Sequence, residues 1–321
     1  MPRRLITLML ASTALLTAHG VRAQDYPSKP MRMIVPFPAG GPTDLTARII
    51  GHKLAEAWGQ QVVVDNRGGA NGIIGQEACA KAPPDGYTMM TQSIAFVINP
   101  SLYKPPYHPL DDFTPVTQVA TTPLMLVVNP GVAAKSVTEL VALAKSKPNQ
   151  LNYASFGQGS IAHLAGEMLK TMTDIQMVHV AYKGVPQSVG DVIAGQMQVM
   201  FPTIPSALPH VRSGRLRALA VTSRNRVAVA SEVPTMVEAG VPGYETGTWN
   251  GIFLPGKTPK PLVDKLHAEI VRIIKQSDVR EQFDSQGFDP LGSTPEAFSK
   301  FIRAEMDKYA KVVKAAGLKV E

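Results

Sequence analysis

One arrangement of residues restricts the possible folds of this sequence more than any other: a short apolar run, a glycine-rich loop and a helical pattern follow one another repeatedly. In the first such unit, residues 31–35 are typical of a strand, residues 36–44 of a loop, and the segment up to Gly59 of a helix. The unit repeats at once in residues 61–81. Strands that alternate with helices predict βαβ units with parallel sheets, so the expected fold class is α/β.

A second series of such units follows a proline-rich passage at residues 104–109. Residues 124–128 have an apolar strand pattern, and residues 151–155, 156–160 and 161–171 are predicted as strand, loop and helix. A mature chain of about 300 residues is also longer than one hydrophobic core usually supports. We therefore expect two lobes.

The C-terminal part is mainly helical in pattern, at residues 261–275 and 295–316. Such a segment completes a lobe only by packing on a sheet formed earlier, so it is expected to return to the first lobe. Two crossings would form a hinge, near residues 121–123 and 247–249. The predicted division is residues 24–122 plus 248–321 for lobe 1, and residues 123–247 for lobe 2.

The N-terminus has the pattern of a secretory signal. Arg3 and Arg4 precede an uncharged apolar run at residues 5–18, and small residues at Val21 and Ala23 occupy the positions that a signal peptidase reads. A membrane-spanning helix needs about 20 apolar residues, which is longer than this run. We predict that residues 1–23 are a cleaved signal peptide and that the mature protein is exported and soluble.

Charge and cysteine content exclude several classes of protein. Cleavage would remove three arginines and no acidic residue, which lowers the formal net charge from +7 to +4. The remaining lysines and arginines are scattered, so we expect no nucleic-acid partner. Cys79 is the only cysteine, which excludes an internal disulfide and a multi-cysteine metal site, and the histidines lack metal-ligand spacing.

The strongest candidate site is the first loop, where Gly40 and Gly41 precede Pro42, Thr43 and Asp44. Glycines let a ligand approach the backbone, and the free N–H groups at the start of a helix bind carboxylates. The same residues are also explained as a well-formed helix start, and on this fragment alone both interpretations stay open.

A second loop of the same kind, at residues 155–160, lies in the other predicted lobe and also connects a strand to a helix. The loop at residues 68–72 has a similar placement. In open α/β sheets, ligands bind at the carboxyl ends of the strands, so these loops are expected to face one cleft and to hold an anion together.

An alternative interpretation of the second loop is dinucleotide binding, because residues 157–162 match G-x-G-x-x-A. However, no acidic residue stands about 20 positions later to hold a ribose, where the chain reads Val180-Ala181-Tyr182-Lys183. We therefore expect no cofactor. Hydrolase motifs such as G-x-S-x-G and H-E-x-x-H are absent from the sequence.

A series of short motifs runs through essentially the whole mature chain, at residues 26–30, 35–44, 64–67, 82–88, 99–103, 112–116, 152–155, 163–167, 180–184, 205–209 and 216–222. Their order and spacing resemble the Bug (Bordetella uptake gene) receptors, the periplasmic solute-binding proteins of tripartite tricarboxylate transporters. The resemblance implies a two-lobed periplasmic-binding-protein (Venus flytrap) fold and a monomeric receptor. Such a receptor is not an enzyme: it captures a small carboxylate and delivers it to membrane transporter subunits.

Carried over to this chain, the resemblance implies ligand-binding residues in both loops. They are Phe37, Ala39, Gly40, Gly41 and Asp44 in the first loop, with Ser155, Gly159 and Ser160 opposite. Ser93 and Thr203 complete the predicted site and lie in two segments where this chain departs from the family pattern.

Those departures make the predicted pocket more apolar. Pro202 and Thr203 follow Met200-Phe201 where relatives commonly carry an aspartate, residues 92–96 are bulkier than usual, and Phe156 replaces a small polar residue. We therefore expect a hydrophobic or aromatic carboxylate rather than a citrate-like ligand. Two alternatives stay open at this point: an exported α/β enzyme that acts on an organic acid, and an interaction protein with no functional pocket.

Overall fold

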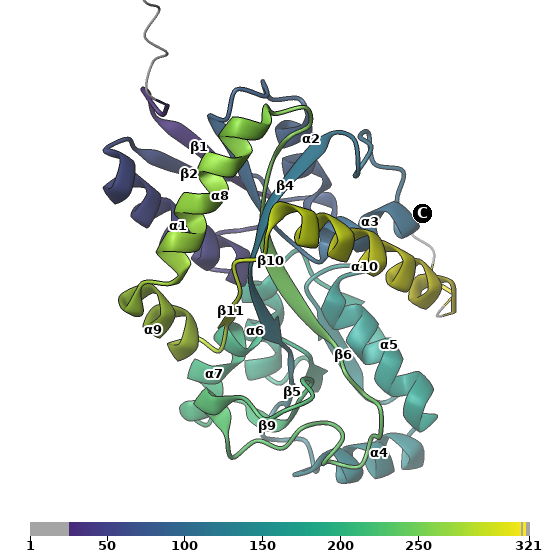
Figure 1. The fold of residues 1–321 in the computed structure, drawn as a ribbon. Coiled ribbons are helices and arrows are strands. Elements are labelled where there is room, and N and C mark those ends of the chain that lie inside the picture. Colours follow the sequence, from purple (N-terminus) through teal and green to yellow (C-terminus); the bar gives the residue numbers. More distant parts are fainter. Residues whose placement is uncertain (1–25, 316, 319–321) are drawn as a thin grey trace, which may run out of the picture.

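The computed structural model describes residues 26–315, 317 and 318, and its elements form two mixed β-sheets with helices packed around them (Figure 1). The predicted signal peptide, residues 1–23, lies outside the described residues. Strands of the first sheet are in the upper part of Figure 1 and those of the second in the lower part.

The first sheet has six strands in the described part of the chain, in the order β11-β4-β10-β3-β1-β2. Strands β1, β2 and β3 are parallel, whereas β10 runs antiparallel to both β3 and β4. The bounds are β1 Met31–Val35, β2 Val62–Asn66, β3 Thr88–Ser93, β4 Phe113–Pro123, β10 Gly247–Pro255 and β11 Asp289–Pro290.

The second sheet has five strands among the described residues, in the order β7-β6-β8-β5-β9. Strand β6 is parallel to β7 and β8, and β5 is antiparallel to β8 and β9. The bounds are β5 Met125–Val128, β6 Asn152–Ser155, β7 Val178–Ala181, β8 Val199–Met200 and β9 Arg217–Val221.

Helices cover both sheets. Those between the strands of the first sheet are α1 Pro42–Trp58, α2 Ile73–Ala80 and α3 Ala95–Leu102, with the short 3-10 turn η1 at Ala70–Gly72. Those of the second are α4 Val137–Ser146, α5 Ile161–Thr173, α6 Val185–Ile193 and α7 Ile204–Arg212, with η2 at Ala228–Ala230. The C-terminal helices are α8 Lys260–Ile274, α9 Ser277–Ser285 and α10 Pro295–Ala315.

The C-terminal helices pack on the first sheet: α8 contacts α1 and β4, and α10 contacts α3 and β4 (Figure 1). Strands β4 and β10 are the longest antiparallel pair, and their register places Gly247 opposite Pro123 and Trp249 opposite Thr121. After Pro123, only Leu124 separates β4 from β5 of the second sheet. The chain therefore passes between the two sheets at two adjacent points.

The hydrophobic core is divided between the faces of the sheets. One cluster joins α1 and α8 to the first sheet through residues such as Met33, Ile50 and Leu266. Another contains Phe96, Phe253 and Phe298 of the first sheet region and extends to Leu126 and Tyr153 of the second sheet. Four of the five residues of β1 are apolar and buried because helices cover both sides of the strand, and the half-buried Arg32 is the exception.

Several elements differ from the sequence-based expectation. Strand β4 and the helices α3, α6, α7 and α9 are not among the predicted elements, and Pro100 and Pro209 lie inside α3 and α7. At the start of α4, Ser136 accepts from the Glu139 N–H, and the Glu139 carboxylate accepts from Lys135 N. Proline disfavours a helix interior, which explains why the sequence pattern hides two of the helices.

Candidate functional site

A cavity of about 710 Å³ lies where loops of the two sheets face each other. Its walls come from the segments that follow β1, β2, β3, β6, β7 and β8, together with two residues of β10. All six strands are parallel to at least one neighbour in their sheet, so the cavity forms at the carboxyl ends of parallel strands, as expected for α/β proteins.

In the first loop, Phe37, Gly41 and Thr43 line the cavity, whereas Ala39, Gly40 and Asp44 do not. Helix α1 begins directly after Gly41, with Pro42 in its first turn, and no side chain caps it. Since the first N–H groups of a helix lack intrahelical acceptors, the Thr43 end of α1 presents a partial positive charge to the cavity.

The Asp44 carboxylate is turned inward. It accepts hydrogen bonds from Gly40 N (2.9 Å), Arg48 Nε (2.8 Å) and Asn66 Nδ2 (2.9 Å), and only 1% of the residue is exposed. Burial alone would raise the pKa of Asp44, but the hydrogen bonds from Arg48, Gly40 and Asn66 outweigh it and hold that pKa below its usual value. The carboxylate therefore fixes the shape of the loop.

In the second loop, Phe156, Gly157, Gln158 and Ser160 line the cavity, whereas Ser155 and Gly159 do not. Ser160 is the N-cap of α5 and accepts from His163 N (3.4 Å). Gly159 has a φ of +70°, and a Cβ there would lie 2.0 Å from Leu102 Cδ1. Only glycine fits this position without a shift of its neighbours.

Two histidines, the buried His163 and the half-buried His179, support the second loop on the side away from the cavity. His163 Nδ1 accepts from Gly159 N (3.0 Å), and His179 Nε2 lies 2.7 Å from Ser155 Oγ. Burial lowers the pKa of His163 to about 4 and that of His179 to about 3. Both rings are therefore neutral at pH 7 and act as hydrogen-bonding supports of the loop.

Further polar residues reach the cavity from the strands between the loops. Ser93 at the end of β3, Thr203 after β8, and Thr248 and Asn250 of β10 line it. Thr248 and Asn250 were missed by sequence analysis, although an amide in the otherwise apolar run from Trp249 to Leu254 was an available signal.

Apolar groups dominate the rest of the lining, among them Phe37, Ile94, Tyr103, Phe156 and Val185. Lys183 is the one charged side chain that lines the cavity among the residues described. Of the ten predicted site residues, the structure thus brings Phe37, Gly41, Ser93, Ser160 and Thr203 together at one cavity. It places Gly40, Asp44, Ser155 and Gly159 in the supporting parts of the loops, and Ala39 is exposed outside the lining of the cavity.

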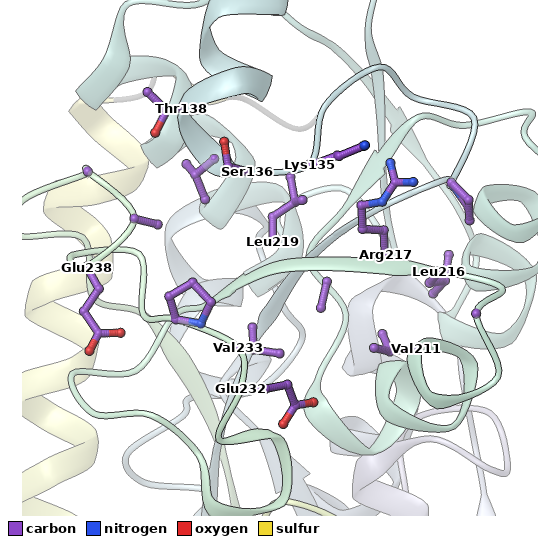
Figure 2. A pocket seen from close by; sticks show the side chains of 17 residues that line it. Lys135, Ser136, Thr138, Val211, Leu216, Arg217, Leu219, Glu232, Val233 and Glu238 are labelled. Atoms are coloured by element: carbon purple, nitrogen blue, oxygen red, sulfur yellow. The ribbon is translucent and has the colours of Figure 1, made fainter.

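A second cavity, of about 720 Å³, lies beside β9 and the start of α4 and contains none of the predicted site residues (Figure 2). Two of its charged residues have internal partners. Arg217 donates to the carbonyls of Val132 and Ala134, and Glu238 accepts from Arg226 Nε and Thr235 N. The cavity at the loops is therefore the better candidate for a ligand site.

Neither a membrane-spanning helix nor a metal-binding cluster is found in the part of the chain that the structure describes. No helix within residues 26–315 is long and apolar enough to cross a membrane. In the same part of the chain, no group of three or more His, Cys, Asp or Glu side chains could hold a metal ion.

Comparison with known proteins decides the family. A model of the tripartite tricarboxylate transporter family receptor matches residues 46–318. The chain belongs to this receptor family. A protein of the tcbD–tcbE intergenic region of Pseudomonas sp. (strain P51) is 40% identical over 95% of this chain and 93% of its own length. BugT of Bordetella pertussis is 37% identical over 94% of this chain and 93% of its own length.

Solved structures of relatives have the same fold. Rpa4515 of R. palustris with adipate has a TM-score of 0.89 at 34% identity, over 92% of this chain and 100% of its own. The periplasmic binding protein BugD has a TM-score of 0.87 and is 34% identical in sequence, and the match covers 92% of this chain and 100% of BugD. MatC from Rhodopseudomonas palustris with bound malate has a TM-score of 0.82 and is 31% identical, and the match covers 90% of this chain and 100% of MatC.

These findings confirm the predicted family and the two-lobed periplasmic-binding-protein fold. The chain is a solute-binding receptor of the tripartite tricarboxylate transporter family, which is a family of binding proteins and not of enzymes. The known members that it resembles are periplasmic.

Proposed function

We propose that this receptor captures a small monocarboxylate with an apolar or aromatic body in the cavity at the loops. The observation that carries the proposal is the composition of the lining: aromatic and aliphatic side chains surround the space, and Lys183 is its single charged group among the described residues. Relatives have been solved with adipate and with malate, which each carry two carboxylates. One cation beside an apolar wall matches a single carboxylate better.

The carboxylate would be held by the N-terminal ends of α1 and α5, with Gly41 and Ser160 at the point of contact and Lys183 adding attraction. Phe37 would pack on the apolar body of the ligand, and Ser93 and Thr203 would offer hydroxyl groups. We assign supporting roles to Gly40, Asp44, Ser155 and Gly159, because their contacts shape the two loops.

We further propose that the lobes, residues 24–122 plus 248–321 and residues 123–247, close over the ligand by a hinge near residues 121–123 and 247–249. The adjacency of Pro123 and Gly247 supports this placement. The loaded monomer would then deliver the carboxylate to the membrane subunits of its transporter, in the periplasm, after cleavage of residues 1–23.

Isothermal titration calorimetry of the purified protein tests the choice of ligand. The panel contains benzoate, phenylacetate, hexanoate, adipate, malate and citrate, and we expect the first three to bind more tightly than the last three. Tight citrate binding with no response to the aromatic acids would contradict the proposal.

Two further measurements test the role as a receptor. Bound acid should raise the melting temperature and should be recovered unchanged after long incubation with the protein. A product that accumulates in step with the protein concentration would instead indicate an enzyme.

A further inference from the structure

Asn250 stands at the floor of the cavity, in the middle of the first sheet. It lies in β10, opposite Ser93 of β3 on one side and Ala120 of β4 on the other. The residue is 1% exposed and lines the cavity. Thr248, two positions earlier on the same strand, also lines the cavity, so both side chains are on one face of the sheet.

Both polar atoms of this amide lack a partner. Neither Nδ2 nor Oδ1 of Asn250 makes a hydrogen bond to any residue in the described part of the chain. A buried donor and acceptor that stay unpaired are destabilising, so such a group is expected to pair with something that enters the cavity. An amide also requires a complementary group: its nitrogen needs an acceptor and its oxygen needs a donor.

The neighbouring groups determine which chemistry fits. Ser93, Thr203 and Thr248 surround this end of the cavity with neutral hydroxyls, and Thr203 Oγ1 is already 3.1 Å from Ser206 Oγ. A second carboxylate would meet no positive charge here and would leave Asn250 Oδ1 without a donor. A hydroxyl both donates and accepts, so it satisfies either atom of the amide.

We propose that Asn250 forms a specificity subsite for a hydroxyl group on the ligand, in addition to the site of its carboxylate. This inference rests on the proposed function, since it assigns the second polar group of the acid held in the same cavity. The receptor would then select hydroxylated monocarboxylates over unsubstituted acids and over dicarboxylates of the same length.

Calorimetry with matched acids tests the subsite. The probes are the linear acids of four to eight carbons, their ω-hydroxy derivatives and the corresponding dicarboxylates, together with benzoate, 3-hydroxybenzoate and 4-hydroxybenzoate. We expect the best hydroxy acid to bind at least about 10-fold more tightly than its unsubstituted parent, because only the hydroxyl pairs the buried amide.

The variant Asn250→Leu has a similar volume and no polar atoms. It should abolish the preference for the hydroxy acid while it keeps the affinity for the unsubstituted parent within about 3-fold, since the apolar contacts stay in place. Its melting temperature without ligand should equal or exceed that of the wild type, because an unpaired amide is removed from the interior.

The outcomes separate the two proposals. If unsubstituted acids bind but the hydroxyl gives no gain, or if the gain persists in Asn250→Leu, the subsite is wrong and the proposed function stands. A marked loss of melting temperature in Asn250→Leu would also overturn the subsite, because it would show that the amide makes structural bonds. If none of the acids binds the wild type, the proposed function fails and the subsite fails with it.

Discussion

The imidazole ring of His163 lies flat against that of His179, with the ring centroids 3.6 Å apart and the planes 5° from parallel. His163 comes from α5 and His179 from β7, and each bonds a different residue of the loop between β6 and α5. Two protonated rings at this distance would repel each other in a buried place. The loop at the cavity is therefore supported by a pair that must stay uncharged.

Stability should fall in mild acid because of this pair. The folded pKa values of about 4 and about 3 lie below the ordinary value of 6.5, so the unfolded chain takes up protons first as the pH falls. The contribution of the pair is complete above about pH 6.5 and declines steadily toward pH 4. Melting temperatures measured from pH 7.5 to 4.5 should show this slope.

The variant His163→Asn tests the origin of the slope. Its Oδ1 can accept the Gly159 N–H in place of Nδ1 and cannot be protonated in this range. The melting temperature of the variant should depend less steeply on pH between 6.5 and 4.5. Parallel profiles for the variant and the wild type would contradict the explanation.

Asp44→Ala should lower the free energy of unfolding by about 2–4 kcal/mol, since Gly40 N, Arg48 and Asn66 lose a shared, buried acceptor. Urea unfolding followed by circular dichroism measures the change. The control is Asp264→Ala, which breaks an exposed pair with Lys260 on α8 and should have no measurable effect. Equal losses in both variants would refute the supporting role of Asp44.

Gly159→Ala should destabilise the protein by about 2–4 kcal/mol, because alanine disfavours a positive φ and its Cβ would overlap Leu102. Gly190→Ala is the matched control: it lies inside α6 with no atom within 4 Å of its Cβ position, so it should be neutral or slightly stabilising.

The overlap itself can be tested with a double variant. Leu102→Ala removes the side chain that the new methyl group of Gly159→Ala would strike, so the two losses together should be smaller than their sum by about 1 kcal/mol or more. Strict additivity would leave the backbone conformation as the sole cause of the loss.

Lys183→Gln should weaken the binding of benzoate about 3–5-fold at low ionic strength, because it removes the charge that attracts the carboxylate. The lysine is exposed, so the difference should shrink in about 0.3 M salt. Calorimetry at two salt concentrations measures both effects. An affinity that is unchanged at low salt would exclude Lys183 from the proposed site.

The sequence predicted much of the fold because strand and helix periodicities are local. Strands β1, β5 and β6 and helices α1, α5 and α8 lie where the pattern places them, within about three residues. Strand β4 escaped prediction because Pro115, Pro123 and its polar residues give no clear alternation. It is stabilised by its long pairing with β10, which is about 130 residues away along the chain.

For the site, the sequence by itself determined the chemistry of the two loops: the glycines, the helix starts and the apolar neighbours that make an anion site possible. Only the tertiary structure decided which of these groups face the cavity. Asp44 and Gly41 are three positions apart, yet the first is bound internally by Asn66 and the second lines the space. Likewise, the neighbours of Asn250 come from strands that the local sequence cannot pair. Residue types follow from the chain, whereas burial and unpaired hydrogen-bonding groups arise only when distant segments meet.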